Sequence, residues 1–321
     1  MGSCPLDGSR RSALRVLNEA VPAHTHDHID WADRLAHLRA ADALDAAAMT
    51  TAARRLVAAL PPRPTIVDLG CGAGGMSTHF ARELAALSGG TVVLVDATPA
   101  LLEEAERTVK AEADKHVAQD SAGERGPVEV RAILGDLADA GLPHTLPPAD
   151  LVWASHVVHH LADQQAAVGT VAAVAKPGGL VALAEGGLDF RCLPWDLGVG
   201  RPGLENRMLA AQAEWFIGMR EGIDGAVPMP YGWSIALDRA GLTEVDSFGV
   251  LVHHPSPGPD SLVDYVVNRI DRLREFVGDQ LAAEDRATVD ALLDPAGPHF
   301  VGGRRDLYLL GAKTVHCGRR P

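Results

Sequence analysis

A run of apolar residues that ends in an acid and closely spaced glycines is the clearest chemical signal in this sequence. Residues 65–75 are Thr-Ile-Val-Asp-Leu-Gly-Cys-Gly-Ala-Gly-Gly, with Asp68 near the end of the apolar part. Glycines at such spacing let the backbone N–H and C=O groups of a tight turn approach a ligand without a Cβ in the way. The pattern therefore predicts a buried strand that ends in a ligand-binding turn.

The spacing of these glycines fits two kinds of cofactor. Gly70, Gly72 and Gly75 satisfy the G-x-G-x-x-G pattern of a dinucleotide-binding turn, in which the next helix N-terminus holds a pyrophosphate. Gly70, Gly72 and Gly74, preceded by Asp68, satisfy a D-x-G-x-G-x-G pattern, in which the turn holds the amino-acid end of S-adenosylmethionine (SAM). A carboxylate at Asp68 repels a pyrophosphate and attracts an ammonium group, so it favours SAM.

Further acids and histidines follow the later apolar segments. Asp96 lies about 20 residues beyond the glycine turn, where a carboxylate can accept both hydroxyls of a ribose. Gly135-Asp136 follows another apolar segment, and its carboxylate can accept an adenine amino group. His156 and His160 are spaced to share one helix face. These two histidines and Glu185 are the candidate catalytic residues, for work as a base or in orienting a hydroxyl.

Alternating strands and helices must bring these residues together. Such an order predicts a parallel sheet with helices on both faces, and right-handed crossovers place the strand C-termini at one edge. One crevice is therefore expected to collect the acids, Ser155 and the histidines. The strands are expected at residues 65–69, 91–96, 128–134, 150–155 and 179–185, and the helices at 74–88, 99–117, 163–175, 204–219, 233–240, 260–277 and 283–293.

Five motifs in this order resemble those of the class I SAM-dependent methyltransferases. The matching segments are Asp68–Gly74, Asp96, Gly135-Asp136, Asp150–Leu161 and Lys176–Gly179. The resemblance implies an α/β, Rossmann-like sheet of seven strands with helices on both faces, in which segments 244–251 and 306–315 form an antiparallel edge pair. It also implies SAM as the cofactor, with contacts at Asp68, Gly70, Cys71, Gly72, Gly74, Asp96, Ala97, Gly135, Asp136, Leu137 and Ser155.

The chain departs from this family pattern in its added parts. We expect an N-terminal helical lid or extension over residues 1–62 and a SAM-binding core over 63–190. A helical substrate-cap insertion follows over 191–242, and the rest of the core lies over 243–321, with a helical insertion at 258–300. The added parts resemble the substrate cap of small-molecule methyltransferases of bacterial secondary metabolism.

Aromatic and methionine residues gather in the expected cap of a chain with only 4% aromatic residues. Such a group can line an apolar substrate site, although Trp215 and Met219 also fit the core stripe of an amphipathic helix. The N-terminal segment can cover the methyl donor. Substrate contacts are accordingly expected at His28, Trp31, Trp215, Met219, Tyr231 and Trp233.

Composition narrows the classes of partner. The formal net charge of −13 over 321 residues disfavours nucleic acid, whose phosphates need a basic patch. No apolar run has the length of a membrane span, and residues 1–11 lack the apolar region of a secretory signal. Four scattered cysteines indicate free thiols and a cytoplasmic location. Histidines occupy alternate positions at His24, His26 and His28. No second group of ligands accompanies them in the sequence, so we expect no metal site.

The expected activity is transfer of the SAM methyl group to a small, largely apolar or aromatic metabolite in natural-product biosynthesis. The sequence leaves oxygen, nitrogen and carbon acceptors open, and it carries no signal for the oligomeric state. One alternative is a methyltransferase-like protein that keeps SAM as a non-donating cofactor for cyclisation or binding. The other is an NAD-dependent oxidoreductase, which Asp68, Asp136 and the Ser155–His160 segment disfavour.

The expected lid leads to the first prediction. Deletion of residues 1–28 should lower the turnover number without unfolding the core, because the segment covers the reacting groups but the strands lie beyond it. Circular dichroism and steady-state kinetics of the truncated chain measure the two effects. Full activity in the truncated chain excludes the lid.

Overall fold

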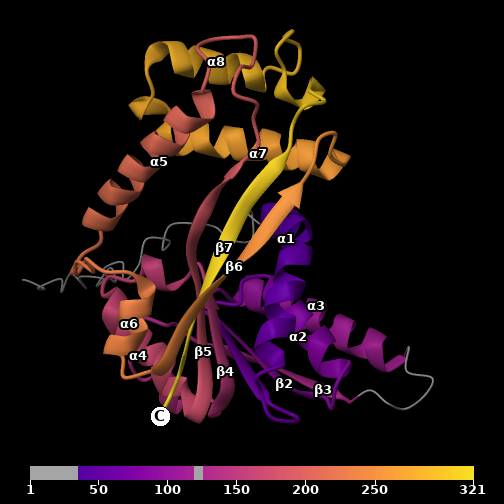
Figure 1. Cartoon of the computed structure of the whole chain (residues 1–321), viewed down its shortest axis with the longest axis vertical. Coiled ribbons are helices and arrows are strands. Elements are labelled where there is room, and N and C mark those ends of the chain that lie inside the picture. Colours follow the sequence, from indigo (N-terminus) through magenta and orange to yellow (C-terminus); the bar gives the residue numbers. More distant parts are fainter. Residues whose placement is uncertain (1–34, 119–125) are drawn as a thin grey trace, which may run out of the picture.

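A seven-stranded sheet runs through the molecule, in the order β3-β2-β1-β4-β5-β7-β6 (Figure 1). The structure is a computed structural model, and it describes residues 35–118 and 126–321. β7 (Leu309–Arg319) is antiparallel to both β5 and β6 (Thr243–His254). The other strands are parallel: β1 (Thr65–Leu69), β2 (Gly90–Asp96), β3 (Val128–Leu134), β4 (Ala149–Ser155) and β5 (Ala175–Arg191). This arrangement confirms the expected Rossmann-like sheet and its antiparallel edge pair.

Helices cover both faces of the central parallel strands, which explains why β1, β2 and β4 are almost continuously apolar. Ile66, Val67 and Leu69 of β1 are all fully buried, although they point to alternate faces. One face carries α1 (Leu35–Val57), α2 (Gly75–Ala85) and α3 (Pro99–Ala118), and the other carries α4 (Gln164–Val174) and α6 (Trp233–Arg239). No helix in the described part of the chain has the length and apolar character of a membrane span.

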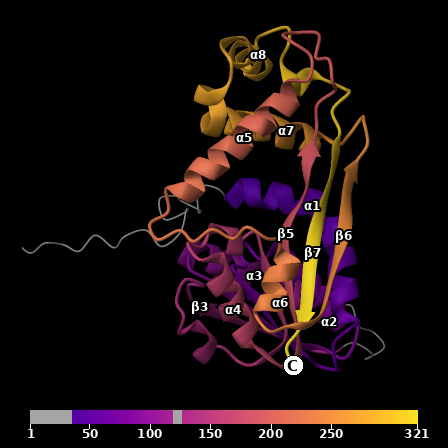
Figure 2. The same ribbon diagram turned by 60° about the vertical axis from the view of Figure 1, so that its left-hand side comes forward.

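The long strands β5, β6 and β7 extend beyond the parallel part and carry a separate helical layer (Figure 1). This layer holds α5 (Leu204–Glu221), α7 (Asp260–Val277) and α8 (Ala283–Leu293), and the last two match their predicted bounds. Figure 2 shows α5 slanting from this layer down to the level of α1. The prediction of a strand limited to 179–185 was wrong, because antiparallel pairing with β7 continues β5 as far as Arg191.

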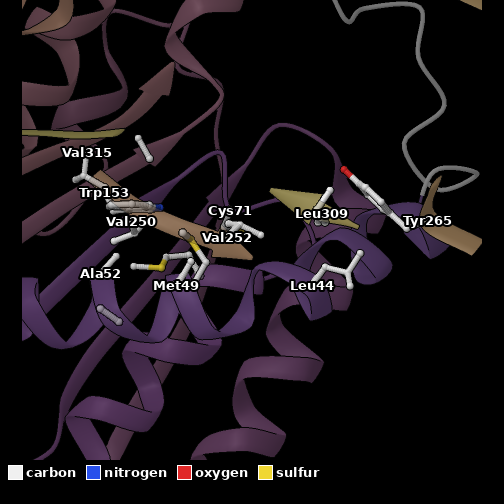
Figure 3. Close-up of a cluster of buried hydrophobic side chains, with 14 of the residues drawn as sticks. Leu44, Met49, Ala52, Cys71, Trp153, Val250, Val252, Tyr265, Leu309 and Val315 are labelled. Atoms are coloured by element: carbon white, nitrogen blue, oxygen red, sulfur yellow. The ribbon is translucent and has the colours of Figure 1, made fainter. Parts of the chain in front are cut away.

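Helix α1 is held to the sheet by an apolar cluster (Figure 3). Met49 and Ala52 lie against Trp153 of β4 and Val250 of β6 in this cluster, and all four side chains are buried. Full burial of a large apolar side chain contributes about 1.5–3 kcal/mol to stability. A helix was expected within residues 1–62, and from Leu35 onward α1 packs on the sheet as part of the folded core. Leu38 of this helix lines the cavity described below.

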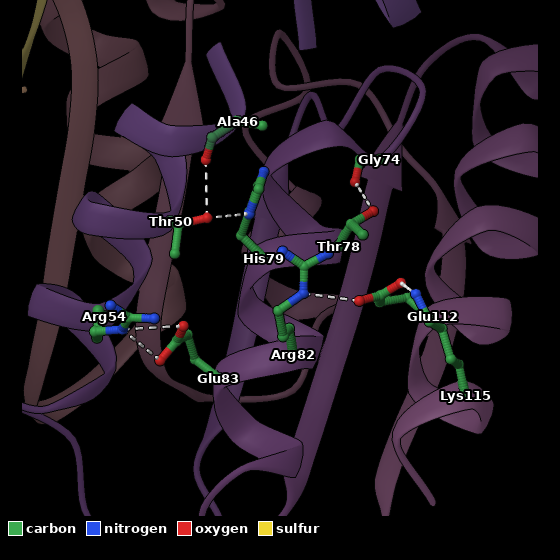
Figure 4. Close-up of polar contacts among 10 residues, drawn as sticks. All are labelled: Ala46, Thr50, Arg54, Gly74, Thr78, His79, Arg82, Glu83, Glu112 and Lys115. Atoms are coloured by element: carbon green, nitrogen blue, oxygen red, sulfur yellow. Dashed lines mark hydrogen bonds and ion pairs between the residues drawn. The ribbon is translucent and has the colours of Figure 1, made fainter. Parts of the chain in front are cut away.

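Polar contacts connect α1 to α2 (Figure 4). The Thr50 hydroxyl donates to the Ala46 carbonyl at 2.8 Å and lies 3.0 Å from His79 Nδ1, and Arg54 pairs with Glu83 at 3.3 Å. His79 is 7% exposed, and its burial lowers the pKa of its imidazole to about 4. The ring is therefore neutral in the folded protein at neutral pH.

The lowered pKa of His79 predicts a loss of stability in acid. Between pH 6.5 and 4 the unfolded chain binds a proton at this ring that the folded chain does not, so the free energy of unfolding falls with pH. The decrease is on the order of 3 kcal/mol. The measurement is thermal unfolding from pH 7 to pH 4 for wild type, His79→Asn and the exposed control His144→Asn. His79→Asn should show a shallower pH dependence than the other two proteins, and equal slopes contradict the assignment.

Candidate functional site

A cavity of about 310 Å³ lies at the C-terminal ends of the parallel strands, where the sequence predicted a crevice. The expected residues in its wall are Gly70, Gly72, Asp96, Ala97, Gly135, Asp136, Leu137 and Ser155, together with His156 and His160. Asp68, Cys71 and Gly74 are absent from the wall. The sequence analysis did not identify the apolar part of the wall, which includes Leu38, Leu101, Leu142, Val157 and Leu161.

The glycine turn between β1 and α2 has the backbone conformation that its composition predicts. Gly70, Gly72 and Gly74 all have left-handed φ angles, of 69°, 53° and 87°. A Cβ at Gly70 would lie 2.3 Å from the Val157 side chain, whereas one at Gly72 would meet nothing within 4 Å. Gly74 instead provides room for α3, since a Cβ there would lie 3.0 Å from the Ala105 backbone. The glycines of the turn that line the cavity are therefore Gly70 and Gly72.

Asp96 fastens this turn to the end of β2. Its Oδ2 accepts the Gly72 N–H at 2.9 Å, and its Oδ1 accepts the Thr98 N–H at 2.8 Å. The residue also lines the cavity, and burial raises the pKa of its carboxyl above the usual range. Each carboxylate oxygen has a second lone pair, so the group can still accept the hydroxyls of a ribose.

Asp68 lies beneath the turn and outside the cavity wall. It is 2% exposed and accepts the Ser77 hydroxyl at 2.6 Å. Burial first, and then the charges of Asp96 and Asp42, raise the pKa of this carboxyl to about 7. Asp68 was expected from the sequence to be fully ionised, and this expectation is corrected because burial makes the charge costly. Cys71 is also buried, and its burial raises the pKa of the thiol.

An apolar slot forms the β3 side of the cavity. Leu101, Leu137 and Leu142 line it, and Gly135 allows Leu142 to approach, since a Cβ at Gly135 would lie 2.6 Å from Leu142 Cδ1. Asp136 lies at its edge, where Oδ1 accepts the Ala138 N–H at 2.8 Å. A flat apolar slot with a carboxylate at its edge has the character of a site for a heterocycle such as adenine.

The histidine segment after β4 does not form the single helix face that the spacing predicted. His156 has a left-handed φ of 54°, and Val158–His160 form only a 3₁₀ turn, η2. The left-handed residue ends the strand and prevents a continuous helix, so the prediction of a shared helix face was wrong. His156 and His160 nevertheless both line the cavity. Desolvation by nearby protein atoms, and next the charge of Lys313, lower the pKa of the His156 ring, although the residue as a whole is exposed.

Glu185 and His159 form a pair that the sequence analysis did not find. Glu185 is 1% exposed, and its Oε1 accepts the N–H groups of Val157 and Val158 at 3.1 and 2.9 Å. Its Oε2 lies 2.6 Å from His159 Nδ1. The carboxylate expected to act as a base is thus bound to the turn and to a third histidine. The sequence could have predicted this pair, because β4 and β5 were both expected as parallel strands, and their C-terminal ends lie side by side at this edge.

Helix α5 covers the outer side of the histidine turn. Phe216 of α5 lies 5.8 Å from the His159 ring, centroid to centroid. Arg220 donates from Nη1 to the carbonyl oxygens of His159 at 3.1 Å and Leu161 at 2.5 Å. The end of α5 and the turn that carries His159 are therefore held together.

The residues expected to bind substrate are dispersed. Trp215 stacks on Phe276 of α7 at 5.0 Å, and the Tyr231 hydroxyl donates to Gln165 of α4 at 3.0 Å. Neither Trp215, Tyr231, Met219 nor Trp233 belongs to the cavity wall of the described residues. Phe216 is the member of the aromatic group that reaches the histidines. His28 and Trp31 lie outside the described residues.

Comparisons with known proteins identify the family. The family model of the methyltransferase domain matches residues 67–181. The ubiquinone biosynthesis O-methyltransferase of Methylobacterium nodulans is 30% identical over 212 residues, which cover 63% of this chain and 71% of that protein. This chain belongs to the class I SAM-dependent methyltransferases. Its cofactor is SAM.

Solved structures with lower identity are also similar to this methyltransferase. A methyltransferase of Bacillus halodurans has 17% identity and a TM-score of 0.44, over 84% of this chain and 98% of that one. A SAM-dependent methyltransferase of Thiobacillus denitrificans, solved in complex with S-adenosylhomocysteine, has 18% identity and a TM-score of 0.39, over 84% and 90% of the two chains.

The position of Asp96 predicts a loss of cofactor affinity on substitution. Asp96→Ala removes the acceptor for the ribose and leaves the N–H groups of Gly72 and Thr98 without their carboxylate. The dissociation constant for SAM should rise on the order of a hundredfold, measured by titration calorimetry. Asp139→Ala is the matched control, because this exposed acid also accepts a turn N–H but lies outside the cavity wall. Unchanged affinity in Asp96→Ala removes this residue from the site.

Proposed function

We propose that this methyltransferase transfers the methyl group of SAM to a hydroxyl oxygen of a small, largely apolar or aromatic metabolite. The observation that carries the proposal is the 2.6 Å pair between His159 Nδ1 and Glu185 Oε2 beside the cofactor cavity. A hydroxyl must lose a proton when it is methylated, and a histidine oriented by a carboxylate can accept that proton. The Methylobacterium relative is named an O-methyltransferase, which supports an oxygen acceptor.

Glu185 determines which nitrogen of His159 is free. A carboxylate beside Nδ1 favours the tautomer with a proton on Nδ1 and a lone pair on Nε2. Nε2 can then take the acceptor proton, and the resulting imidazolium is stabilised by the carboxylate it already contacts. Glu185 therefore orients the base and stabilises its protonated form. The two backbone N–H groups that donate to Oε1 keep Glu185 in place. Its role is that of a positioning residue.

The rest of the catalysis is alignment. SAM supplies an activated methyl group on a sulfonium. The oxygen attacks the methyl carbon as the carbon–sulfur bond breaks, and the proton passes to His159 Nε2. Correct positioning of two reacting groups can supply on the order of 7–11 kcal/mol of the barrier reduction. The glycine turn, Asp96 and the apolar slot support such positioning for the donor.

Aromatic side chains beside the base favour an aromatic acceptor. The ring centroid of Phe216 lies 5.8 Å from that of His159, and the ring centroid of His160 lies 3.8 Å from it. Rings of this kind pack favourably against a flat acceptor such as a phenol. The net charge of −13 supports a small-molecule acceptor and disfavours nucleic acid. The added helical layer supports a place in natural-product biosynthesis, and the buried free thiols of Cys71, Cys192 and Cys317 support a cytoplasmic location.

The proposed base predicts the kinetics of two variants. His159→Gln and Glu185→Gln should lower the turnover number by about 10²–10⁴-fold, because the acceptor keeps its proton. The dissociation constant for SAM should stay within about threefold of wild type, since neither residue lines the cofactor cavity. His144→Gln, an exposed histidine on the turn after β3, is the control.

The assay uses SAM labelled in the methyl group with phenols and the amines of the same ring structure. Label in the phenol ether is the expected result. Label only in the amine, or full turnover in both variants, contradicts the proposal. Product formed without label transfer indicates the alternative in which SAM is a non-donating cofactor.

A further inference from the structure

The side chains around Glu185 also have the composition of a metal site. His156, His159 and Glu185 each present one ligand atom, and these three atoms lie within 4.8 Å of one another. Two imidazole nitrogens and one carboxylate oxygen are the protein ligands of a well-known class of catalytic zinc site, in which a further position stays open. From the sequence, His24–His28 were the only candidate metal ligands, and no metal site was expected.

We propose that the His156–His159–Glu185 cluster binds a zinc-class divalent transition ion, such as Zn²⁺ or Co²⁺, and that the bound ion blocks methyl transfer. The blocking half of this proposal rests on the proposed function, because it requires His159 to be the base. The binding half does not depend on the reaction.

The three ligands come from backbone that is already fixed. His156 holds a left-handed conformation that few residues other than glycine adopt, and its N–H donates to the Ala184 carbonyl at 3.1 Å. Glu185 is held by the N–H groups of Val157 and Val158. His159 lies on the η2 turn. Arg220 of α5 holds this turn by donating hydrogen bonds to the carbonyl oxygens of His159 and Leu161. A site whose ligands are held before the ion arrives costs little to organise.

The separations suit an ion after small side-chain rotations. Ligand atoms about 2.0–2.2 Å from a tetrahedral zinc lie roughly 3.3 Å from one another. His159 Nδ1 and Glu185 Oε2 are now 2.6 Å apart, so an ion between them moves them outward. The His156 nitrogen, within 4.8 Å of both, moves inward. His156 also lines the cofactor cavity, so the open coordination position can face the reacting groups.

The charges around the cluster are compatible with a cation. The ammonium group of Lys313 acts electrostatically on His156 and would repel a cation. Asp45 of α1 forms an ion pair with this ammonium group, which reduces the repulsion. His316 Nε2 lies 3.3 Å from the Glu185 carbonyl oxygen, and the His160 ring lies beside His159, so imidazoles make up much of the surroundings. An ionised Glu185 and two neutral imidazoles leave one positive charge on the bound ion.

Occupation of the cluster removes the base by a change of tautomer. The ion forms a bond to His159 Nδ1, and the proton of Nδ1 moves to Nε2, so the imidazole stays neutral with the same number of protons. Nε2 then carries an N–H and has no lone pair for the acceptor proton. The Glu185 carboxylate oxygen exchanges its contact with the Nδ1 proton for a bond to the ion.

Binding is tested on the full chain after removal of metals with a chelator. Co²⁺ is the probe, because cobalt in a four- or five-coordinate protein site absorbs visible light far more strongly than hydrated cobalt. Zinc titration calorimetry gives the stoichiometry and affinity. We expect one ion in the cluster, with affinity lowered at least tenfold in His156→Asn and in Glu185→Gln. Asparagine is chosen because it tolerates the left-handed backbone of position 156.

The matched control replaces His24, His26 and His28 together by alanine. This triple variant should keep the cobalt spectrum. Loss of the spectrum in the triple variant, or its full retention in a folded His156→Asn, overturns the site. Circular dichroism verifies that each variant is folded, so a loss of the ion is assigned to the ligands.

Blocking is tested by adding Zn²⁺ to the methyl-transfer assay. For each protein the rate is expressed relative to the rate of that protein without zinc. The relative rate of wild type should fall with the same midpoint as zinc binding. The midpoint for His156→Asn should lie at a zinc concentration at least tenfold higher. Zinc binding with an undiminished or increased rate overturns the blocking half and counts against His159 as the base. The absence of zinc binding overturns the site and leaves the proposed function standing.

Discussion

One buried carboxylate, that of Glu185 at the end of the parallel part of β5, organises the segment that follows β4. It is 1% exposed, and its two oxygens hold two backbone N–H groups and one imidazole of the segment after β4. A buried charge is costly unless such partners surround it. The segment after β4 therefore has little freedom, and its shape, including the left-handed His156, follows from the need to satisfy this group.

The β2 side of the cavity depends on a second carboxylate in the same way. Asp96 at the end of β2 accepts N–H groups from the glycine turn and from the start of α3, so it fixes two backbone segments that line the cavity. Helix α1 completes this side. A Cβ at Gly75 would lie 2.4 Å from the Asp42 carboxyl group of α1, so a side chain at Gly75 would displace this carboxyl group. The C-terminal ends of β2 and β5, with β1 and β4 between them, thus place Asp96 and Glu185 at one edge of the sheet.

Local pattern was enough to predict much of this structure. The order of apolar strands, turns and acids along the chain predicted the parallel sheet. The predicted cofactor residues Gly72, Asp96 and Asp136 line one cavity. Spacing alone paired His156 with His160, because it could not reveal a left-handed residue that interrupts the helix. The partner of Glu185 is His159, and this contact depends on which strands are neighbours. The extension of β5 to Arg191 has the same origin, since it requires β7, more than a hundred residues later.

The central claim is that His159, oriented by Glu185, removes the acceptor proton as the methyl group is transferred. The measurement that tests it most directly is the single-turnover rate of a phenol acceptor as a function of pH, for wild type and His159→Gln. Between pH 7 and the pKa of the phenol, the wild-type rate should change little, because the base is supplied by the protein. The rate of His159→Gln should rise about tenfold per pH unit, since only the free phenolate then reacts. Parallel pH profiles for the two proteins would contradict the account.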